Sequence, residues 1–80
     1  MKIKVTDHYS KETQVRDLSY YITRRMEELS HGHGVVEEVS NRTDYISSYV
    51  ARLLEILVEH KALTLDEIRD ILQTEDTLEE

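Results

Sequence analysis

The apolar positions of residues 43–60 recur with the period of an α-helix. The large aliphatic side chains follow one another at spacings of four, three, one and three residues, at Ile46, Val50, Leu53, Leu54 and Leu57. These spacings keep them on one side of a helix with 3.6 residues per turn. The pattern predicts a helix over 43–60 that turns this stripe toward the core.

A second, shorter helix is predicted over 64–73. Thr64 is followed three residues later by Glu67, which is the spacing of a capping box, where each side chain accepts a hydrogen bond from the other residue's backbone N–H. Leu63 and Ile68 flank the box as in a hydrophobic staple. Since the connection to the preceding helix is short, the two helices should form an αα-hairpin.

A third helix is predicted over 10–30, with Ser10 as its N-cap and Gly32 just beyond its end. Its apolar residues have spacings of three, four, four and three, at Val15, Leu18, Ile22, Met26 and Leu29. The connection over 31–42 is long for two neighbouring helices, so it should hold an ordered loop or a short strand at Val35–Val39.

The two ends of the chain have different patterns. In residues 1–8, Ile3 and Val5 alternate with lysines, which indicates a short edge strand or an extended arm, although no convincing second strand is available to pair with it. Residues 74–80 are polar and acidic, and we expect them to fray. The expected fold is mainly α: residues 1–80 as a single small three-helix domain with a C-terminal αα-hairpin.

The size of the chain limits its core. A domain of 80 residues buries only about 60% of the surface that its unfolded chain exposes. Without cysteine it has neither a disulfide nor a thiolate metal site, so self-association or a partner is a plausible source of further stability. No apolar run approaches the roughly 20 residues of a membrane helix, and the first residues do not resemble a signal peptide. A cytoplasmic protein is therefore expected.

The formal net charge of −7 is concentrated near the end of the chain. Residues 63–80 contain seven acidic residues and only one basic residue, Arg69. Such a surface repels phosphates and attracts basic partners, so a basic protein surface is the expected partner and nucleic acid is not. The candidate docking residues are Asp66, Glu67, Asp70, Glu75 and Asp76. The alternative is a solvated end that only aids solubility.

Two further groups of residues are candidate binding surfaces. All five aromatic residues are tyrosines, a residue type suited to surfaces that are half wet and half buried. A second stripe on helix 43–60, with spacings of four, three and four, is a candidate oligomer or partner face unless the other elements cover it: Tyr45, Tyr49, Arg52 and Ile56. On helix 10–30, two Tyr/Arg pairs at a spacing of four form a possible nucleotide or phosphate patch, or two surface cation–π pairs: Tyr20, Tyr21, Arg24 and Arg25.

Motifs for catalysis are missing from the sequence. There is no cysteine nucleophile, no Gly-rich phosphate loop and no Gly-x-Ser-x-Gly turn. His31 and His33 are the only close pair of potential metal ligands, and a metal site normally needs three or four. The sequence therefore predicts a protein that is not an enzyme and that holds neither metal nor cofactor.

The hairpin segment over residues 52–68 resembles two known families. It is similar to the first two helices of helix-turn-helix and winged-helix domains, but its second helix carries Asp66, Glu67 and Asp70 where DNA reading needs basic and amide groups. It also resembles the N-terminal helical segment of nitrile hydratase α subunits. The cysteine motif of that family is missing, so the resemblance implies at most a subunit-docking role.

Taken together, these features predict a non-catalytic protein-protein interaction module that forms a homo-oligomer. Its most concrete version is a small acidic inhibitor or regulator that docks on a basic partner surface and resembles anti-CRISPR proteins in size and charge. The alternatives are nucleotide or nucleic-acid binding through the Tyr/Arg patch, and a small structural subunit of a larger complex.

Overall fold

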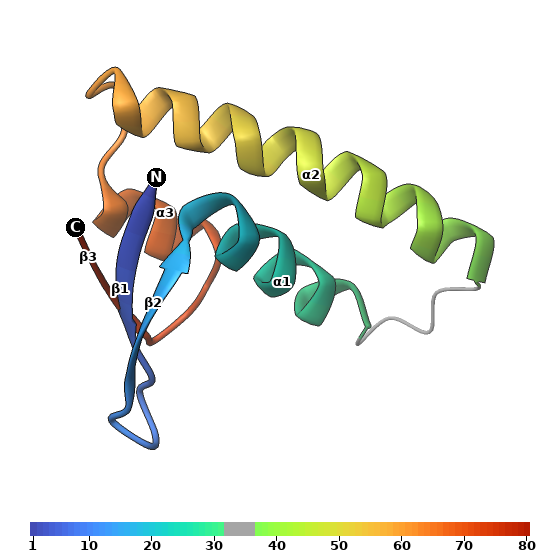
Figure 1. Ribbon diagram of the computed structural model, residues 1–80. Helices are drawn as coiled ribbons and strands as arrows, with labels where there is room; N and C mark the ends of the chain where they lie inside the picture. Colours follow the sequence, from blue (N-terminus) through green and yellow to red (C-terminus); the bar gives the residue numbers. More distant parts are fainter. Residues whose placement is uncertain (32–36) are drawn as a thin grey trace.

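The protein combines a small antiparallel sheet with three helices (Figure 1). The computed structural model describes residues 1–31 and 37–80, and the side chains of residues 1–29 and 46–80. The elements in chain order are β1 (Lys2–Thr6), β2 (Thr13–Asp17), α1 (Leu18–His31), α2 (Glu37–Glu59), α3 (Leu65–Ile71) and β3 (Thr77–Glu79). The fold is therefore α+β, and the predicted mainly α three-helix domain was wrong.

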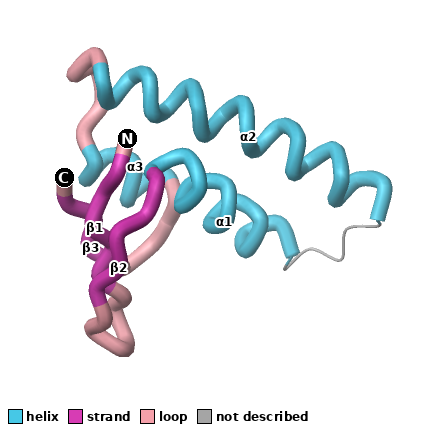
Figure 2. Tube along the Cα trace, viewed as in Figure 1, coloured by secondary structure: helices cyan, strands magenta, loops and turns pink. Residues whose placement is uncertain are grey.

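The strand at the start of the chain is the centre of the sheet. The strand order is β2-β1-β3, and β1 pairs antiparallel with both neighbours (Figure 2). Val5 lies opposite Gln14 on one side and opposite Leu78 on the other. The alternation in residues 1–8 did indicate a strand. The expectation that it is an arm or an edge strand was wrong, because both of its partners come from segments that were not interpreted as strands.

The first of these partners is β2, which replaces the beginning of the predicted helix 10–30. The helix starts only at Leu18, and Val15 pairs with Lys4 in the sheet with 64% of its surface exposed. Ser10 is not an N-cap, since its backbone N–H donates to Asp7 Oδ1 at 2.9 Å in the β1–β2 connection. Val15 is the only apolar residue of β2, so it fits the spacing of a helix and of a strand equally well. Pairing with β1 decides between them.

The second partner is β3, in the segment that was expected to fray. Leu78 is buried, with 6% of its surface exposed, and belongs to the hydrophobic core. The backbone of β3 pairs with Lys4, Val5 and Thr6 of β1. The frayed acidic tail over 74–80 is thus corrected to a short strand, because one buried leucine and the second edge of β1 hold it in place.

The connection between α1 and α2 is shorter than predicted. Because α2 begins at Glu37, residues 37–39 of the candidate strand are helical. The other residues of that strand, Val35 and Val36, and the predicted helix end at Gly32 lie outside the described residues.

The core lies between the sheet and the helices. Its buried apolar residues are Ile3, Val5, Leu18, Ile22, Ala51, Val58, Ile68, Leu72 and Leu78. Helices α1 and α2 lie side by side and run antiparallel (Figure 1). The buried side of α2 carries two small residues, Ser47 and Ala51. Their small size allows a neighbouring element to pack close to the axis of α2. Two residues of the predicted core stripe, Ile46 and Leu53, are instead 59% and 57% exposed.

The connection between α2 and α3 has the predicted structure. Glu67 N–H donates to Thr64 Oγ1 at 3.1 Å and Thr64 N–H donates to Glu67 Oε1 at 3.1 Å, which confirms the capping box. Before it, Lys61 has a φ of 58°, in the left-handed region, and the Ala62 N–H donates to the Leu57 carbonyl at 2.9 Å. This Schellman ending reverses the chain within a few residues.

Candidate functional site

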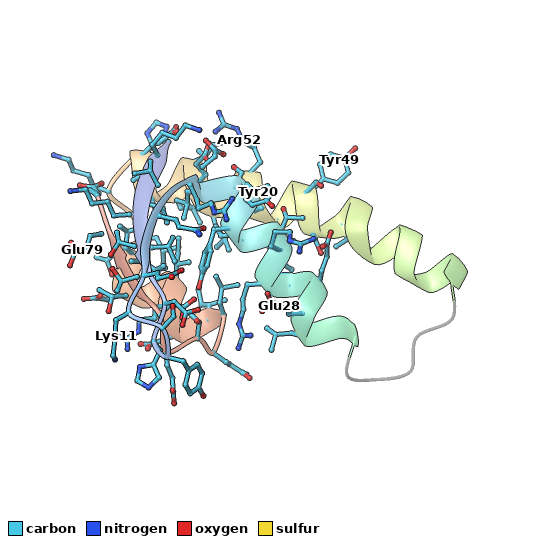
Figure 3. The ribbon with its side chains drawn as sticks, turned by 60° about the horizontal axis from the view of Figure 1, so that its bottom comes forward. Lys11, Tyr20, Glu28, Tyr49, Arg52 and Glu79 are labelled. Carbon is cyan, nitrogen blue, oxygen red and sulfur yellow. The ribbon has the colours of Figure 1, made fainter. Side chains whose placement is uncertain are left out.

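The most exposed apolar surface of the described residues runs along α2. Ile46, Tyr49, Leu53 and Ile56 have exposed fractions of 59%, 65%, 57% and 36%, and they are separated by three, four and three residues. We call these four residues the α2 ridge. It lies on the opposite side of the helix from Ser47 and Ala51, and Figure 3 shows Tyr49 projecting from α2 away from α1. The ridge is therefore open to an incoming molecule.

The predicted oligomer or partner face coincides only in part with this ridge. Tyr49 and Ile56 belong to both, and Arg52 is exposed beside the ridge. The side chain of Tyr45 lies outside the described residues. Ile46 and Leu53 complete the ridge, and sequence reasoning missed them because their spacing also fits the core stripe.

One flank of the ridge is charged and the other is apolar. Arg52 and Glu59 share one flank, with Arg52 Nη1 3.6 Å from Glu59 Oε1, and their side chains are 56% and 42% exposed. Val50 and Leu57 are half-buried and occupy the other flank. The ridge is thus a narrow apolar strip with a polar margin on one side only.

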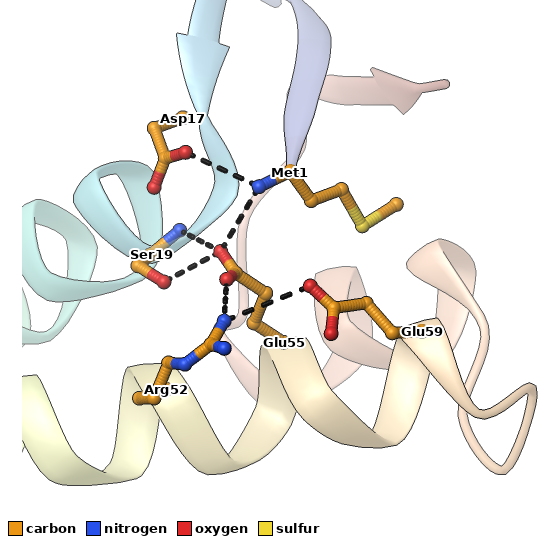
Figure 4. A network of polar contacts seen from close by, with 6 residues as sticks. All are labelled: Met1, Asp17, Ser19, Arg52, Glu55 and Glu59. Carbon is orange, nitrogen blue, oxygen red and sulfur yellow. Dashed lines mark hydrogen bonds and ion pairs between the residues drawn. The ribbon is translucent and has the colours of Figure 1, made fainter.

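Behind the ridge, a buried carboxylate fixes α2 to the rest of the fold (Figure 4). Glu55 Oε2 accepts hydrogen bonds from the hydroxyl and the backbone N–H of Ser19, at 2.6 Å and 3.2 Å, and lies 3.6 Å from the amino nitrogen of Met1. Arg52 donates to the other carboxylate oxygen of Glu55, and Asp17 also contacts the Met1 nitrogen, at 3.3 Å. One side chain therefore joins α2 to the starts of β1 and α1.

The charge of this carboxylate is maintained by its partners. Burial raises the pKa of Glu55. The hydrogen bond from the Ser19 hydroxyl and the positive charge of the Met1 amino group together lower this pKa by more than burial raises it, so it lies below the ordinary value. Sequence reasoning did not find Glu55. The one available signal was an acidic residue at a helix position between the apolar Ala51 and Val58.

A groove of about 670 Å³ lies between α1, the α3–β3 connection and the end of the sheet that carries the β1–β2 connection. It brings together residues that the sequence had assigned to two separate surfaces. All four residues of the Tyr/Arg patch line it, and so do the last two residues of the acidic set: Tyr20, Tyr21, Arg24, Arg25, Glu75 and Asp76.

Half of the Tyr/Arg patch has a structural role in this groove. The Tyr21 hydroxyl donates to Asp76 Oδ2 at 2.9 Å, and burial raises the pKa of Tyr21 to about 12. Arg25 donates to the carbonyls of Leu72 and Gln73 at 3.0 Å and 2.8 Å, so it stabilises the end of α3. These two side chains hold the segment that leads into β3.

The other half of the patch remains at the surface. The Arg16 guanidinium lies 5.5 Å from the centre of the Tyr20 ring, and Arg24 contacts Glu27 at 3.5 Å. The groove as a whole is lined by more carboxylates than guanidinium groups: Asp7, Glu12, Glu28, Glu75 and Asp76 against Arg16, Arg24 and Arg25. Its electrostatic potential does not favour a phosphate.

The five residues of the predicted acidic docking surface are divided between two places. Asp66, Glu67 and Asp70 are exposed on α3, where Glu67 also forms the capping box. Glu75 contacts His8 Nε2 at 3.1 Å, and Asp76 accepts hydrogen bonds from Tyr21 and from the backbone of His8. Only the α3 part is an open acidic surface.

Within the described ranges, no group of three potential metal ligands comes together, and no helix is long and apolar enough to cross a membrane. The chain matches no protein-family model, no curated protein and no solved structure. Its fold and surfaces define a small α+β protein with one long helix exposed along its outer side.

Proposed function

We propose that the protein is a non-catalytic interaction module that binds another protein through the α2 ridge. The observation that supports it is the set of four large apolar side chains, each between 36% and 65% exposed, at helical spacing on one side of α2. A helix that presents anchors at these spacings fits an apolar groove or a second helix. Large exposed apolar patches of this kind commonly mark interaction sites.

The inhibitor or regulator predicted from the sequence remains one version of this proposal. In it, the ridge supplies most of the affinity, since central apolar and aromatic anchors dominate interface energies. The exposed acidic side chains of α3, Asp66 and Asp70, would then speed association with a basic partner, because charges at the rim mainly affect association rates. Nucleotide binding through the Tyr/Arg patch is less well supported, since Tyr21 and Arg25 already bind the α3–β3 connection.

Affinity purification with paired variants tests the proposal. The bait is the wild-type protein, Leu53→Asp or Ile71→Asp, and each variant replaces a side chain that is more than half exposed, 57% and 54%. Both should keep the wild-type circular dichroism spectrum, because neither side chain is buried. The proposal expects one protein to be captured by the wild type and by Ile71→Asp but not by Leu53→Asp.

The captured protein is then purified and titrated against the same three baits. Leu53→Asp should raise the dissociation constant at least about 30-fold, the effect of losing an interface hot spot. Equal binding by all three baits would refute the role of the ridge. A fourth bait, the double variant Asp66→Lys with Asp70→Lys, tests the acidic face of α3. If this bait alone lost binding, the docking surface would be that acidic face and not the ridge.

A further inference from the structure

The outer edge of β2 carries backbone groups that have no strand beside them. β2 stands at the end of the strand order β2-β1-β3, so within the described residues it pairs with β1 alone. In Figures 1 and 3, α1 leads from the end of β2 away from the sheet rather than back along the strand. The first four residues of β2 are all exposed: Thr13, Gln14, Val15 and Arg16. This edge is therefore accessible to another extended segment.

The hydrogen bonds at the two ends of the β1–β2 ladder fix its alternation. At one end, the Leu18 N–H donates to the Met1 carbonyl at 2.8 Å. At the other end, the Asp7 N–H donates to the Glu12 carbonyl at 2.9 Å. In an antiparallel ladder, hydrogen-bonded pairs alternate with pairs that share no backbone hydrogen bond. Counting inward by two residues from either end therefore identifies the bonded pairs in between.

By this count, Gln14 and Arg16 are the residues of β2 whose backbone groups point toward β1. Thr13 and Val15 direct their N–H and C=O groups the other way, toward the free edge. Asp17 has the same orientation, but it immediately precedes α1, where its carbonyl accepts the first hydrogen bond of the helix. A new strand would therefore exchange its backbone hydrogen bonds with Thr13 and Val15.

The side chains along this edge carry charges of both signs. Glu12, Gln14 and Arg16 are two residues apart and therefore project from the same face of the strand. Glu12 and Arg16 lie about 13 Å apart along one strand, too far to pair with each other. Arg16 contacts Gln14 and the ring of Tyr20. The ion pairs of the described residues include neither Glu12 nor Arg16.

These charges are complementary to those of a second copy. When two β2 strands pair antiparallel about a two-fold axis between the two copies of Gln14, Glu12 of each copy lies opposite Arg16 of the other. Thr13 of each copy then lies opposite Val15 of the other, so the outward backbone groups meet in bonded pairs. The whole seam lies within residues 12–16, where the β1–β2 ladder is continuous.

Neighbouring registers lack this match. An axis at Val15 sets Arg16 opposite Gln14. An axis at Thr13 sets Glu12 opposite Gln14, so neither arrangement brings opposite charges together. An axis at Arg16 sets two guanidinium groups directly opposite each other, which is unfavourable. Any extended segment satisfies the backbone, whereas the charges require an acid and a base four residues apart, and β2 itself supplies both.

We propose that the protein forms a dimer in which two β2 strands pair antiparallel about Gln14, with Glu12 of each copy bound to Arg16 of the other. The two sheets then become one continuous sheet with three strands from each copy. Because the axis is perpendicular to this sheet, the helices of both copies lie on the same face. The seam shares no residue with the α2 ridge, so the proposal goes beyond the proposed function and does not depend on it.

The first part of the test measures mass by light scattering from about 1 μM to about 1 mM, a range that covers weak association. The wild type should change from the monomer mass of 9.5 kDa to twice that value. Glu12→Arg and Arg16→Glu should each weaken dimerisation roughly 3- to 30-fold, because each sets like charges opposite each other twice. Glu12→Arg is the sharper variant, since it brings the net charge of −7 closer to zero and would promote association through net charge alone.

The second part exchanges both charges within one chain. The double variant Glu12→Arg with Arg16→Glu restores the two attractive pairs in the same register, so it should dimerise as the wild type does. This rescue has to occur between copies, because the two positions are too far apart to pair within one strand. Lys61→Glu and Asp70→Lys are the controls, since they make the same changes in net charge at exposed positions away from β2. Each should dimerise as the wild type does.

The third part follows amide hydrogen exchange by NMR at low and high protein concentration. The N–H groups of Thr13 and Val15 should exchange at least about tenfold more slowly where the dimer forms, because they donate across the seam. The N–H groups of Gln14 and Arg16 donate to β1 with or without a second copy, so they should not gain protection in this way. Protection without this alternation would overturn the pairing of the two β2 strands.

The mass measurements can also overturn the proposal. A mass of 9.5 kDa at every concentration excludes the dimer. A dimer that tolerates both single charge variants, or that the double variant does not restore, excludes the register about Gln14. Leu53→Asp should dimerise as the wild type does, because the α2 ridge takes no part in the seam. A dimer lost in Leu53→Asp alone would place the second copy on the ridge and overturn the seam at β2, whereas the partner titration above decides independently whether the ridge binds a different protein.

Discussion

Replacement of the buried carboxylate Glu55 should reveal how α2 is attached to the sheet. Glu55 has 4% of its surface exposed and accepts two hydrogen bonds from Ser19 while it lies near the Met1 amino nitrogen and Arg52. Glu55→Gln keeps the size and one acceptor but removes the charge. It also directs an amide N–H₂ group toward the Met1 amino group or the Arg52 guanidinium, and neither of these cations can accept a hydrogen bond.

The size of the effect follows from the partners that remain. Removal of one member of a fully buried ion pair costs about 3–5 kcal/mol. Here the loss should be smaller, because Arg52 is 56% exposed and can bind water, and the Met1 amino group keeps Asp17 at 3.3 Å. We expect Glu55→Gln to lower the free energy of unfolding by about 1.5 kcal/mol, which for a domain of this size is roughly 6–12 °C in Tm.

The effect should depend on pH in one direction. The pKa of Glu55 is lower in the folded protein than the ordinary value of 4.5, so the unfolded chain takes up the proton first as the pH falls. The stabilisation by Glu55 is then fully present above about pH 4.5 and is lost as the pH falls through the folded pKa. The difference between wild type and Glu55→Gln should therefore be constant near neutrality and shrink on acidification.

Urea unfolding of the two proteins from about pH 7 down to about pH 3, followed by circular dichroism, measures this difference. Glu59→Gln is the matched control on the same flank of α2, since its side chain is 42% exposed and contacts Arg52 only at 3.6 Å. It should change stability by less than about 0.5 kcal/mol. If Glu55→Gln were as mild as this control, or if its effect grew in acid, the attachment of α2 through a charged Glu55 would be refuted.

Three other substitutions examine the ends of the elements by urea unfolding. Leu78→Ala should cost about 2–5 kcal/mol, because it opens a cavity beside β1, and a loss below about 0.5 kcal/mol would mean that β3 is not part of the core. Thr64→Ala should cost about 1 kcal/mol through loss of the cap, and an unchanged stability would argue against the capping box. Lys61→Gly should raise the free energy of unfolding by up to about 1 kcal/mol, since glycine adopts the left-handed conformation without strain. Ala62→Gly is the control and should not raise it. Equal effects of these two substitutions would contradict the Schellman ending.

The sequence by itself determined the elements whose signals lie within a few residues. Thr64 and Glu67 satisfy each other's backbone groups across three positions, so the start of α3 could be predicted from their spacing. The same holds for the strand character of Ile3 and Val5. In each case the interaction that forms the element, a cap or a local periodicity, joins residues that are close in the chain. The predicted αα-hairpin was wrong as a packed pair of helices, because α2 and α3 make few contacts with each other.

Tertiary structure decided which segments pair with β1 and which side of α2 is buried. Val15 and Leu78 are the only apolar residues in β2 and β3, so neither segment has a periodicity of its own. They become strands because β1 has two edges whose backbone groups need partners. On α2, the apolar residues extend around more than half of the helix, and the small residues Ser47 and Ala51 allowed the core to form on their side. Burial there left Ile46 and Leu53 outside, and this long-range choice created the ridge.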